Sequence, residues 1–478
     1  MSGLNGFLAP HLLGKQFHHP FAYVLYNLQA EYHCSYCLRC PVTPKDKLLL
    51  CSNCRLARYC NRECQKQAWT KDHKLECARL KAAFPHLPLS EVLFMARVLE
   101  KLSHIKKHGD EQGWQKERRF DELVTHEQET RNDGAKMERF EKVFEKTKKF
   151  MGEAVVPQRE EFFLVFCRVW INSHSIHASV GTEIGMALDL GVSRYDHSCR
   201  PNATLVFDGF RAVLRPLIPT LDASDYSKTF ISYVDVGRSK YQRRRQLWSQ
   251  WYFWCKCDRC LDPQDDTLTS IRCPNQSCPE PILITEETQP ADMTCPRCNT
   301  LVGKETIARA QEIMNAVPSK LSVCAISHDE LDKYRSMLDN AESLLHSDNV
   351  YLNRLVTAYT EMTGGQDTQR CGIDALTSVY ENYKKYYPAT DRHIGYHLLH
   401  LIKALIERGQ RKDATPYAFE AMNVFEVCFG IEHPYYLKTL ALWTYLDMGA
   451  EKTNQDLIEL MNFNYNRPVD LTALIEKS

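Results

Sequence analysis

The feature that most constrains this chain is a run of paired metal-ligand residues in one short segment. Four pairs, each with two or three residues between its members, follow one another: Cys34 and Cys37, Cys51 and Cys54, Cys60 and Cys64, His73 and Cys77. A Cys-x2-Cys turn offers two thiolates to one tetrahedral zinc ion, and a three-residue gap places both ligands on one helix face. Eight ligands fill two closed sites, so we expect structural zinc in place of a core that this segment is too short to build.

Composition narrows the class of protein further. The chain has 478 residues, which predicts two to four domains, and its basic and acidic residues balance at 60 each. This balance argues against direct nucleic-acid binding. No run reaches the ~18 apolar residues of a membrane span, and the first thirty residues lack the blocks of a secretory signal. We therefore expect no membrane association, and we attribute the twenty cysteines to metal binding in a reducing compartment.

A second group of cysteines lies in the middle of the chain. Cys255, Cys257 and Cys260 supply three zinc ligands, so a fourth must come from elsewhere. The polar string Tyr195-Asp-His-Ser-Cys-Arg-Pro-Asn202 lies upstream, and a short strand is predicted over residues 230–235, ending in a tyrosine.

A further set of cysteines follows directly. Its spacing, with a proline after three of the four cysteines, predicts a small zinc ribbon: Cys273, Cys278, Cys295, Cys298. The first pair is widely spaced, so the alternative that residues 273–298 bind no metal stays open.

Together these motifs resemble the SET and MYND domain (SMYD) family of protein-lysine methyltransferases. The finger is similar to a MYND finger in its ligands and in the segments Arg58-Tyr-Cys60 and Cys64-Gln-Lys-Gln-Ala-Trp69, and residues 171–260 look like a SET core. The resemblance covers nearly the whole chain. It implies that the first ligand pair shares zinc with the third and the second with the fourth. It also implies that Cys199 completes a third zinc site with Cys255, Cys257 and Cys260.

The fold class implied is α+β: a SET-domain β-fold with a pseudoknot, split by the finger and a helical insert, and followed by a helical domain similar to tetratricopeptide arrays. The expected units are a shortened N-terminal part of the SET domain (1–33), the MYND finger (34–77), the helical insert (78–160), the core SET (161–236), the post-SET zinc region with the extra ribbon (237–300) and the helical C-terminal domain (301–478). A weak repeat at an offset of 40, from His393 to Gly409 and from His433 to Gly449, agrees with stacked helical hairpins; a generic helical domain is the alternative.

The resemblance also implies a methyl-donor site for S-adenosylmethionine. Tyr233 would be the active-site tyrosine and would also contact the donor. Asp196 stands where the family has asparagine. The remaining donor-binding positions implied are Gly3, Asn5, Gly6, Asn172, His197 and Phe253.

The function implied is S-adenosylmethionine-dependent methylation of histone or other protein lysines, in cytoplasm and nucleus, by a monomer with three structural zinc ions and a fourth in the ribbon. Alignment of an amine with a sulfonium supplies much of such catalysis, and burial of the lysine lowers its pKa. The alternative is a catalytically impaired scaffold that binds partners through finger and helical tail. MYND fingers bind proline-containing peptides, which makes Gln65 and Trp69 candidates for a docking face; packing of Trp69 beneath the finger is the alternative.

Two charged segments are predicted to be helices with a solvated face. Residues 139–150 place Phe140, Val143, Phe144 and Phe150 at helical spacing, which predicts one buried stripe. The basic run over residues 238–245 could be a nuclear address or a nucleic-acid contact, but we interpret it as the outer face of a helix whose inner side carries Tyr241, Leu247 and Trp248.

Overall fold

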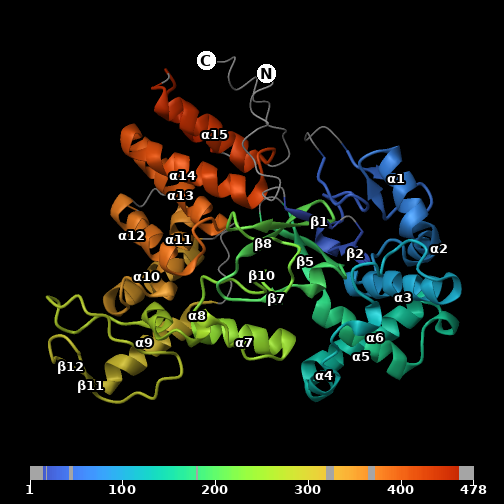
Figure 1. Ribbon diagram of the computed structural model, residues 1–478, viewed down its shortest axis with the longest axis horizontal. Helices are drawn as coiled ribbons and strands as arrows, with labels where there is room; N and C mark the ends of the chain where they lie inside the picture. The colour runs from blue at the N-terminus through green and yellow to red at the C-terminus, as the bar shows by residue number, and fades with distance from the viewer. Residues whose placement is uncertain are drawn as a thin grey trace.

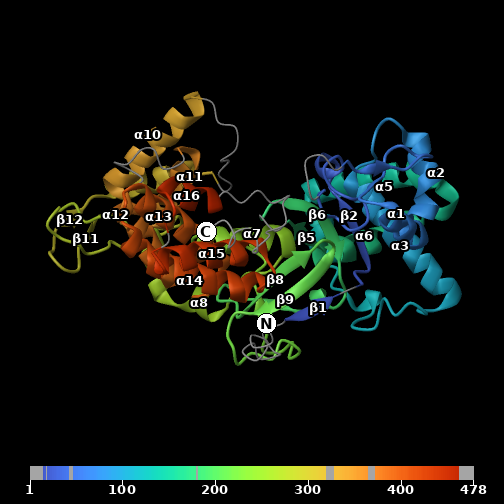
Figure 2. The ribbon, with the colours of Figure 1, turned by 90° about the horizontal axis from the view of Figure 1, so that it is seen from above.

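The computed structural model describes residues 14–17, 19–41, 47–178, 181–318, 328–363, 372–449 and 451–461. The predicted donor loop of Gly3, Asn5 and Gly6 lies outside these residues. Figures 1 and 2 show two groups of helices on opposite sides of a central group of strands, with the early helices on one side and the C-terminal array on the other.

Two three-stranded antiparallel sheets form the centre. One has the order β2 (Ala22–Leu25), β6 (Glu183–Leu188), β5 (His174–His177), and the other has the order β1 (Lys15–Phe17), β9 (Arg211–Pro216), β8 (Ala203–Asp208). Both sheets therefore take one strand from the segment before the finger. The finger and the helices that follow it are inserted between strands of the same fold, as the resemblance implied.

The polar string pairs with the segment before Tyr233. β7 (Asp196–His197) lies parallel to β10 (Phe230–Ile231), Ser198 N donates to Ile231 O at 2.9 Å, and Asn202 N donates to Phe230 O at 3.2 Å. The predicted strand over 230–235 is wrong at its end, because the extended backbone stops at Ile231. The Ser232 hydroxyl donates to Val234 O at 2.6 Å, which turns the chain and places Tyr233 in a bend.

The helical insert packs on the strands around a phenylalanine-rich core. Its helices are α1 (Arg62–Ala68), α2 (Lys74–Ala83), α3 (Ser90–His108), α4 (Glu127–Asn132), α5 (Gly134–Met151) and α6 (Arg159–Asn172). Phe140, Val143 and Phe144 are buried as predicted, whereas Phe150 is only partly buried and Thr147 and Met151 extend the stripe. The 3.6-residue period places 147 and 151 on the inner face. The predicted core SET unit, residues 161–236, does not begin with a strand, because α6 continues as far as Asn172.

The basic run lies on α7 (Lys240–Trp251), and its predicted orientation is partly wrong. Arg243 and Leu247 form the buried side, while the Trp248 side chain is exposed. Arg243 is buried because it forms an ion pair with the buried carboxylate of Asp265. Arg243 Nη2 donates to Asp265 Oδ2 at 2.6 Å. Short helix α8 (Asp258–Leu261), hairpin β11–β12 (Met293–Thr294, Leu301–Val302) and α9 (Lys304–Ala316) follow.

The C-terminal array consists of antiparallel helices. They are α10 (His328–Leu344), α11 (Val350–Thr363), α12 (Ile373–Tyr386), α13 (Arg392–Glu407), α14 (Arg411–Phe429), α15 (Pro434–Asp447) and α16 (Asn454–Leu460). Gly409 and Gly449 follow α13 and α15 with φ of +74° and +62°, a left-handed conformation that glycine adopts at helix C-termini. The repeat read from the sequence therefore corresponds to successive helical hairpins.

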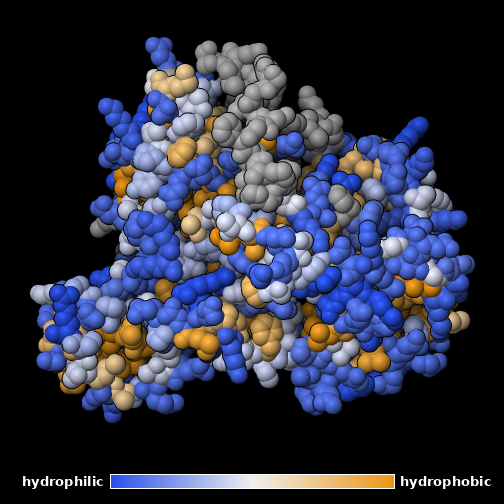
Figure 3. Space-filling model, in the orientation of Figure 1, coloured by the Kyte–Doolittle hydropathy of each residue, from blue (hydrophilic) through white to orange (hydrophobic). Residues whose placement is uncertain are grey.

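In the described ranges, no helix is both long and apolar enough to cross a membrane. The face seen in Figure 3 is mostly hydrophilic, with apolar side chains gathered in smaller patches, one of them near α9.

A buried charge cluster joins the core to the array. The Asp265 carboxylate accepts from Arg243 at 2.6 Å and from Arg259 at 2.7 Å, and all three side chains are almost fully buried. Arg259 Nη1 also donates to Val236 O at 2.8 Å and to Tyr386 O at 3.2 Å. One guanidinium thus connects the segment after Tyr233 with the end of α12.

We predict that Asp265→Asn lowers the free energy of unfolding by about 3–5 kcal/mol, because it leaves two buried guanidinium groups without their carboxylate. Chemical denaturation of the full chain measures the change. Asp208→Asn is the matched control, since its pair with Arg39 is exposed, and such pairs contribute at most about 1 kcal/mol. Equal losses for the two variants would contradict the prediction.

Candidate active site and zinc centres

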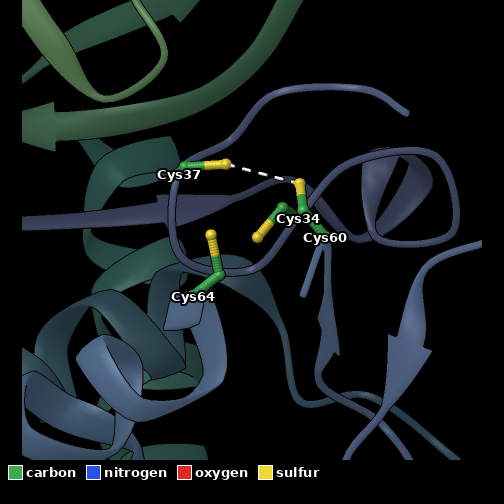
Figure 4. A group of neighbouring side chains, drawn as sticks. All are labelled: Cys34, Cys37, Cys60 and Cys64. Atoms are coloured by element: carbon green, nitrogen blue, oxygen red, sulfur yellow. Dashed lines mark hydrogen bonds between the residues drawn. The ribbon is translucent and has the colours of Figure 1, made fainter. Parts of the chain in front are cut away.

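The first cluster of the finger has four thiols around one centre. The ligand atoms of Cys34, Cys37, Cys60 and Cys64 lie within 4.8 Å of one another. Figure 4 shows the four side chains converging, with Cys64 carried by α1, and Cys37 Sγ lies 3.6 Å from Cys60 Sγ. This is the pairing of first and third ligand pairs that the resemblance implied. Four thiolates in this arrangement fit a structural zinc ion.

The second cluster contains the histidine, together with a pair of residues that holds it. Its ligand atoms also lie within 4.8 Å of one another, and they come from Cys51, Cys54, His73 and Cys77. His73 Nε2 lies 3.4 Å from Cys51 Sγ, while its Nδ1 lies 3.4 Å from a Glu76 carboxylate oxygen that also accepts from Arg97. Such an outer carboxylate orients the imidazole and keeps Nε2 free for the metal. Sequence reasoning missed Glu76 and Arg97; the signal for Glu76 was its position three residues after His73.

The third cluster joins the polar string to the post-SET segment. The sulfur atoms of its four cysteines lie within 4.8 Å of one another: Cys199, Cys255, Cys257, Cys260. Zinc with four thiolates carries a net charge of −2, and Arg243 lies beside it with Nη2 at 3.8 Å from Cys260 Sγ. Arg244 donates to the carbonyls of Cys255 and Cys260 at 3.0 and 3.1 Å. Two arginines of the basic run therefore support this cluster.

A fourth group forms where the ribbon was predicted. Cys273, Cys278, Cys295 and Cys298 bring their sulfur atoms within the same 4.8 Å limit. The part of the chain that the structure describes thus contains four groups whose donor sets fit zinc, and all sixteen predicted ligands belong to them.

One large cavity lies between the core and the array. Its volume is about 1470 Å³, and residues of the insert, the strands, the post-SET segment and the N-terminus of α13 line it. Four of the predicted site residues share this lining: Asn172, Asp196, Tyr233 and Phe253. They come from the end of α6, from β7, from the bend after β10 and from the segment after α7, so only the tertiary fold brings them together.

Tyr233 occupies the wall of this cavity in a fixed orientation. Its hydroxyl donates to Tyr195 O at 2.6 Å, and its ring lies 5.1 Å from that of Trp251. Burial raises the pKa of Tyr233 above its usual value, with the negative charge of Asp196 acting in the same direction. The hydroxyl therefore stays neutral at physiological pH, with its oxygen lone pairs free to accept.

The predicted donor contacts differ in how they present polar atoms. Asp196 is exposed to the cavity, and Asn172 Nδ2 donates to the carbonyls of Val124 and Arg168, both at 2.8 Å. The amide nitrogen of Asn172 is thus engaged and its oxygen remains as an acceptor. The His197 ring does not line the cavity: its Nδ1 accepts from Tyr233 N at 3.0 Å and its Nε2 lies 3.2 Å from Cys199 Sγ. His197 thereby positions Tyr233.

His174 is a cavity residue that sequence reasoning did not select. It begins β5, lines the cavity and stacks on Phe207 with ring centroids 5.7 Å apart. Its Nδ1 is buried and has no hydrogen-bond partner among the described residues. Burial, and then the proximity of His177, lowers the pKa of His174 to about 4, so the ring is neutral. Its position two residues after Asn172 was the available signal.

Comparison with known proteins agrees with this architecture. The MYND finger family model matches residues 34–77. The chain is 32% identical over 257 residues to histone-lysine N-methyltransferase SMYD3 of Mus musculus, a match that covers 52% of this chain and 57% of that protein. It is 26% identical to histone-lysine N-methyltransferase ASHR1 of Arabidopsis thaliana, with 87% of each chain covered, and 24% identical to human N-lysine methyltransferase SMYD2, with 87% of this chain and 89% of that protein covered.

The matches to ASHR1 and SMYD2 extend well beyond the finger, since each covers 87% of this chain. The chain thus contains a MYND finger and is similar to SET and MYND domain (SMYD) proteins.

Proposed function

We propose that the protein is a protein-lysine N-methyltransferase that uses S-adenosylmethionine. The observation that carries this proposal is the position of the Tyr233 hydroxyl in a cavity shared with Asn172, Asp196 and Phe253. The relatives ASHR1 of Arabidopsis thaliana and human SMYD2 are named as lysine methyltransferases, which supports the same proposal.

The residues present fit the proposed methyl donor. Phe253 supplies an aromatic face for adenine, and the Asn172 oxygen and the Asp196 carboxylate supply acceptors for hydroxyl or ammonium groups. The negative charge of Asp196 also favours a sulfonium, which compensates for the amide that the family has at this position. When bound, the donor supplies an electrophilic methyl group.

The protein's own task is to orient the lysine amine. The Tyr233 hydroxyl donates to Tyr195 O, so it can accept from an incoming ammonium group or hold the neutral amine in line with the methyl group. The rings of Tyr233 and Trp251 make this wall apolar, and an apolar wall lowers the pKa of a buried lysine. The lysine would thus lose its proton on entry, without a catalytic metal.

We predict that Tyr233→Phe lowers kcat at least about 100-fold, the loss typical when one oriented hydroxyl or amide is removed from a reacting centre. Transfer of labelled methyl groups to a histone or lysate substrate measures it. Calorimetry with S-adenosylmethionine is the control, because the variant keeps the ring and should still bind the donor. Unchanged turnover would contradict the assigned role, and absence of donor binding by the zinc-loaded wild type would favour a scaffold without turnover.

We predict that His174→Phe raises KM for a protein substrate roughly 2- to 10-fold, the equivalent of one hydrogen bond of about 0.5–1.5 kcal/mol. Phenylalanine keeps the stack on Phe207 but removes the ring nitrogens of a residue that lines the cavity. Steady-state kinetics measures the change, and affinity for the donor should stay constant. A loss of kcat at constant KM would show that His174 acts elsewhere.

A second function, partner binding through the finger, has its own observation. Trp69 is 43% exposed at the start of a π-helical turn, four residues after the partly exposed Gln65. The Trp69 ring packs edge-on against His73, with ring centroids 5.9 Å apart, and the rest of the side chain is exposed. A rigid exposed aromatic ring of this kind suits a proline-containing peptide.

We predict that Trp69→Ala weakens binding of a proline-rich peptide at least about 10-fold, since an aromatic anchor typically contributes more than 1 kcal/mol. Fluorescence anisotropy with a labelled peptide measures the affinity. Leu75→Ala is the control, because Leu75 is also exposed but lies outside the row of Gln65 and Trp69. Equal effects of both variants would show that the contact is not specific.

A further inference from the structure

The ribbon is a small unit held together at its four cysteines. Cys273 lies 3.5 Å from Cys298 and Cys278 lies 3.7 Å from Cys295, measured between sulfur atoms. The hairpin β11–β12 pairs Met293 with Val302 and Thr294 with Leu301, on either side of the second knuckle, Cys295 to Cys298. Cys273 and Cys295 are buried, and Cys278 and Cys298 are partly exposed. Four thiols in one group are enough to fill the four positions of a tetrahedral zinc ion, so the site is closed.

The ribbon is attached to the helical array through its backbone. Ile271 forms isolated bridges with both Ile282 and Leu345, so backbone hydrogen bonds join the ribbon to the residue that follows α10. Arg272 N donates to Leu344 O at 2.9 Å, and its Nε donates to Leu345 O at the same distance. These bonds place the first knuckle, Cys273, directly beside the array.

The loop between the two knuckles reaches the methyltransferase core. Its Glu286 carboxylate accepts from the Tyr351 hydroxyl at 2.5 Å and from the Ser239 hydroxyl. Tyr351 belongs to α11 of the array, whereas Ser239 caps α7 and follows the cavity residue Asp235 by four positions. Glu286 therefore joins the array to the segment that carries Tyr233.

Helix α9 and apolar packing also hold this loop in place. Gln311 Nε2 donates to Thr285 O at 2.9 Å and to Thr288 O at 2.7 Å. Ile282 and Ile284 are buried in the large apolar cluster of the array. The ends of the loop, however, are fixed at Cys278 and Cys295, and a ligand that ties these ends together restricts the whole loop.

The contacts of Glu286 with Ser239 and Tyr351 lie beside the wall of the cavity. Asp235 accepts from the Tyr387 hydroxyl at 3.1 Å, and Asp391, Arg392 and His393 at the start of α13 line the cavity together with Asp235. The placement of the array against the core thus sets the width of the cavity on this side.

We propose that Cys273, Cys278, Cys295 and Cys298 bind a fourth structural zinc ion, and that this ion braces the Glu286 loop and so positions the wall of the cavity that the array supplies. The metal site stands on the geometry of the ribbon alone. Its effect on a protein substrate rests on the proposed methyltransferase function, because the array wall would contact the substrate beyond the donor.

The metal is tested by counting zinc in the purified full chain with plasma mass spectrometry. We expect four ions per wild-type chain and three in Cys278→Ser, whose ligand is partly exposed. Cys40→Ser is the control, because Cys40 lies outside all four groups, and it should keep four ions. Three ions in the wild type would overturn the site. So would four cysteines missing from a thiol count in denaturant with chelator, because the pairs would then be disulfides.

The brace is tested by hydrogen exchange, which needs no activity. In Cys278→Ser and in Glu286→Gln we expect faster exchange over residues 232–240 and 388–396 than in the wild type, with Glu286→Gln keeping four zinc ions. Unchanged exchange in both variants would overturn the brace even if the metal is present.

The effect of the brace on turnover is measured in a separate experiment. Glu286→Gln should lower kcat/KM for a protein substrate on the order of 10-fold through KM, as small displacements of a binding wall do, with donor affinity unchanged. If the wild type transfers no methyl groups, the proposed function fails, while the zinc count and the exchange data still decide the brace. If the wild type is active and both variants match it, the link to the substrate wall is overturned.

Discussion

The ion pairs of Asp265 with Arg243 and Arg259 are the interaction on which the rest of this structure depends. Arg259 reaches the backbone of Val236 after Tyr233 and of Tyr386 at the end of α12, and Arg243 approaches the third cluster. Two buried guanidinium groups with a single carboxylate leave one positive charge without a partner, which costs free energy. The negative charge of a zinc ion with four thiolates compensates for this positive charge, so the metal and the charged cluster stabilise each other.

Zinc supplies stability to the short segments of this fold, where hydrophobic packing cannot. The finger, the post-SET segment and the ribbon are too short to bury large cores, and their ligands come from turns and short helices. The phenylalanine core of α3, α5 and α6 and the core of the array are built by ordinary burial. The cavity lies between these two larger cores, and residues of the insert, the strands, the segment around Phe253 and the start of α13 line it.

Much of the local structure could be predicted because it depends on residues close in sequence. Ligand pairs with two or three residues between them identified the zinc centres, and helical spacing identified the stripe of Phe140, Val143 and Phe144. Gly409 and Gly449 marked the ends of successive hairpins. Local spacing failed where a distant partner intervened: Asp265 drew Arg243 inward, and the turn at Ser232 ended β10 before Tyr233.

By itself the sequence determined the ligand pairs, the order of helical and strand-rich segments and the identity of the candidate tyrosine, because each is encoded within a few neighbouring residues. Only the tertiary structure decided that the His197 ring supports Tyr233 instead of lining the cavity, that His174 lines the cavity while its Nδ1 is buried, and that Glu286 joins ribbon, core and array. These contacts join residues from 36 to 65 positions apart or depend on what surrounds a ring. Burial and hydrogen bonding at such a distance are set by packing, which no local pattern records.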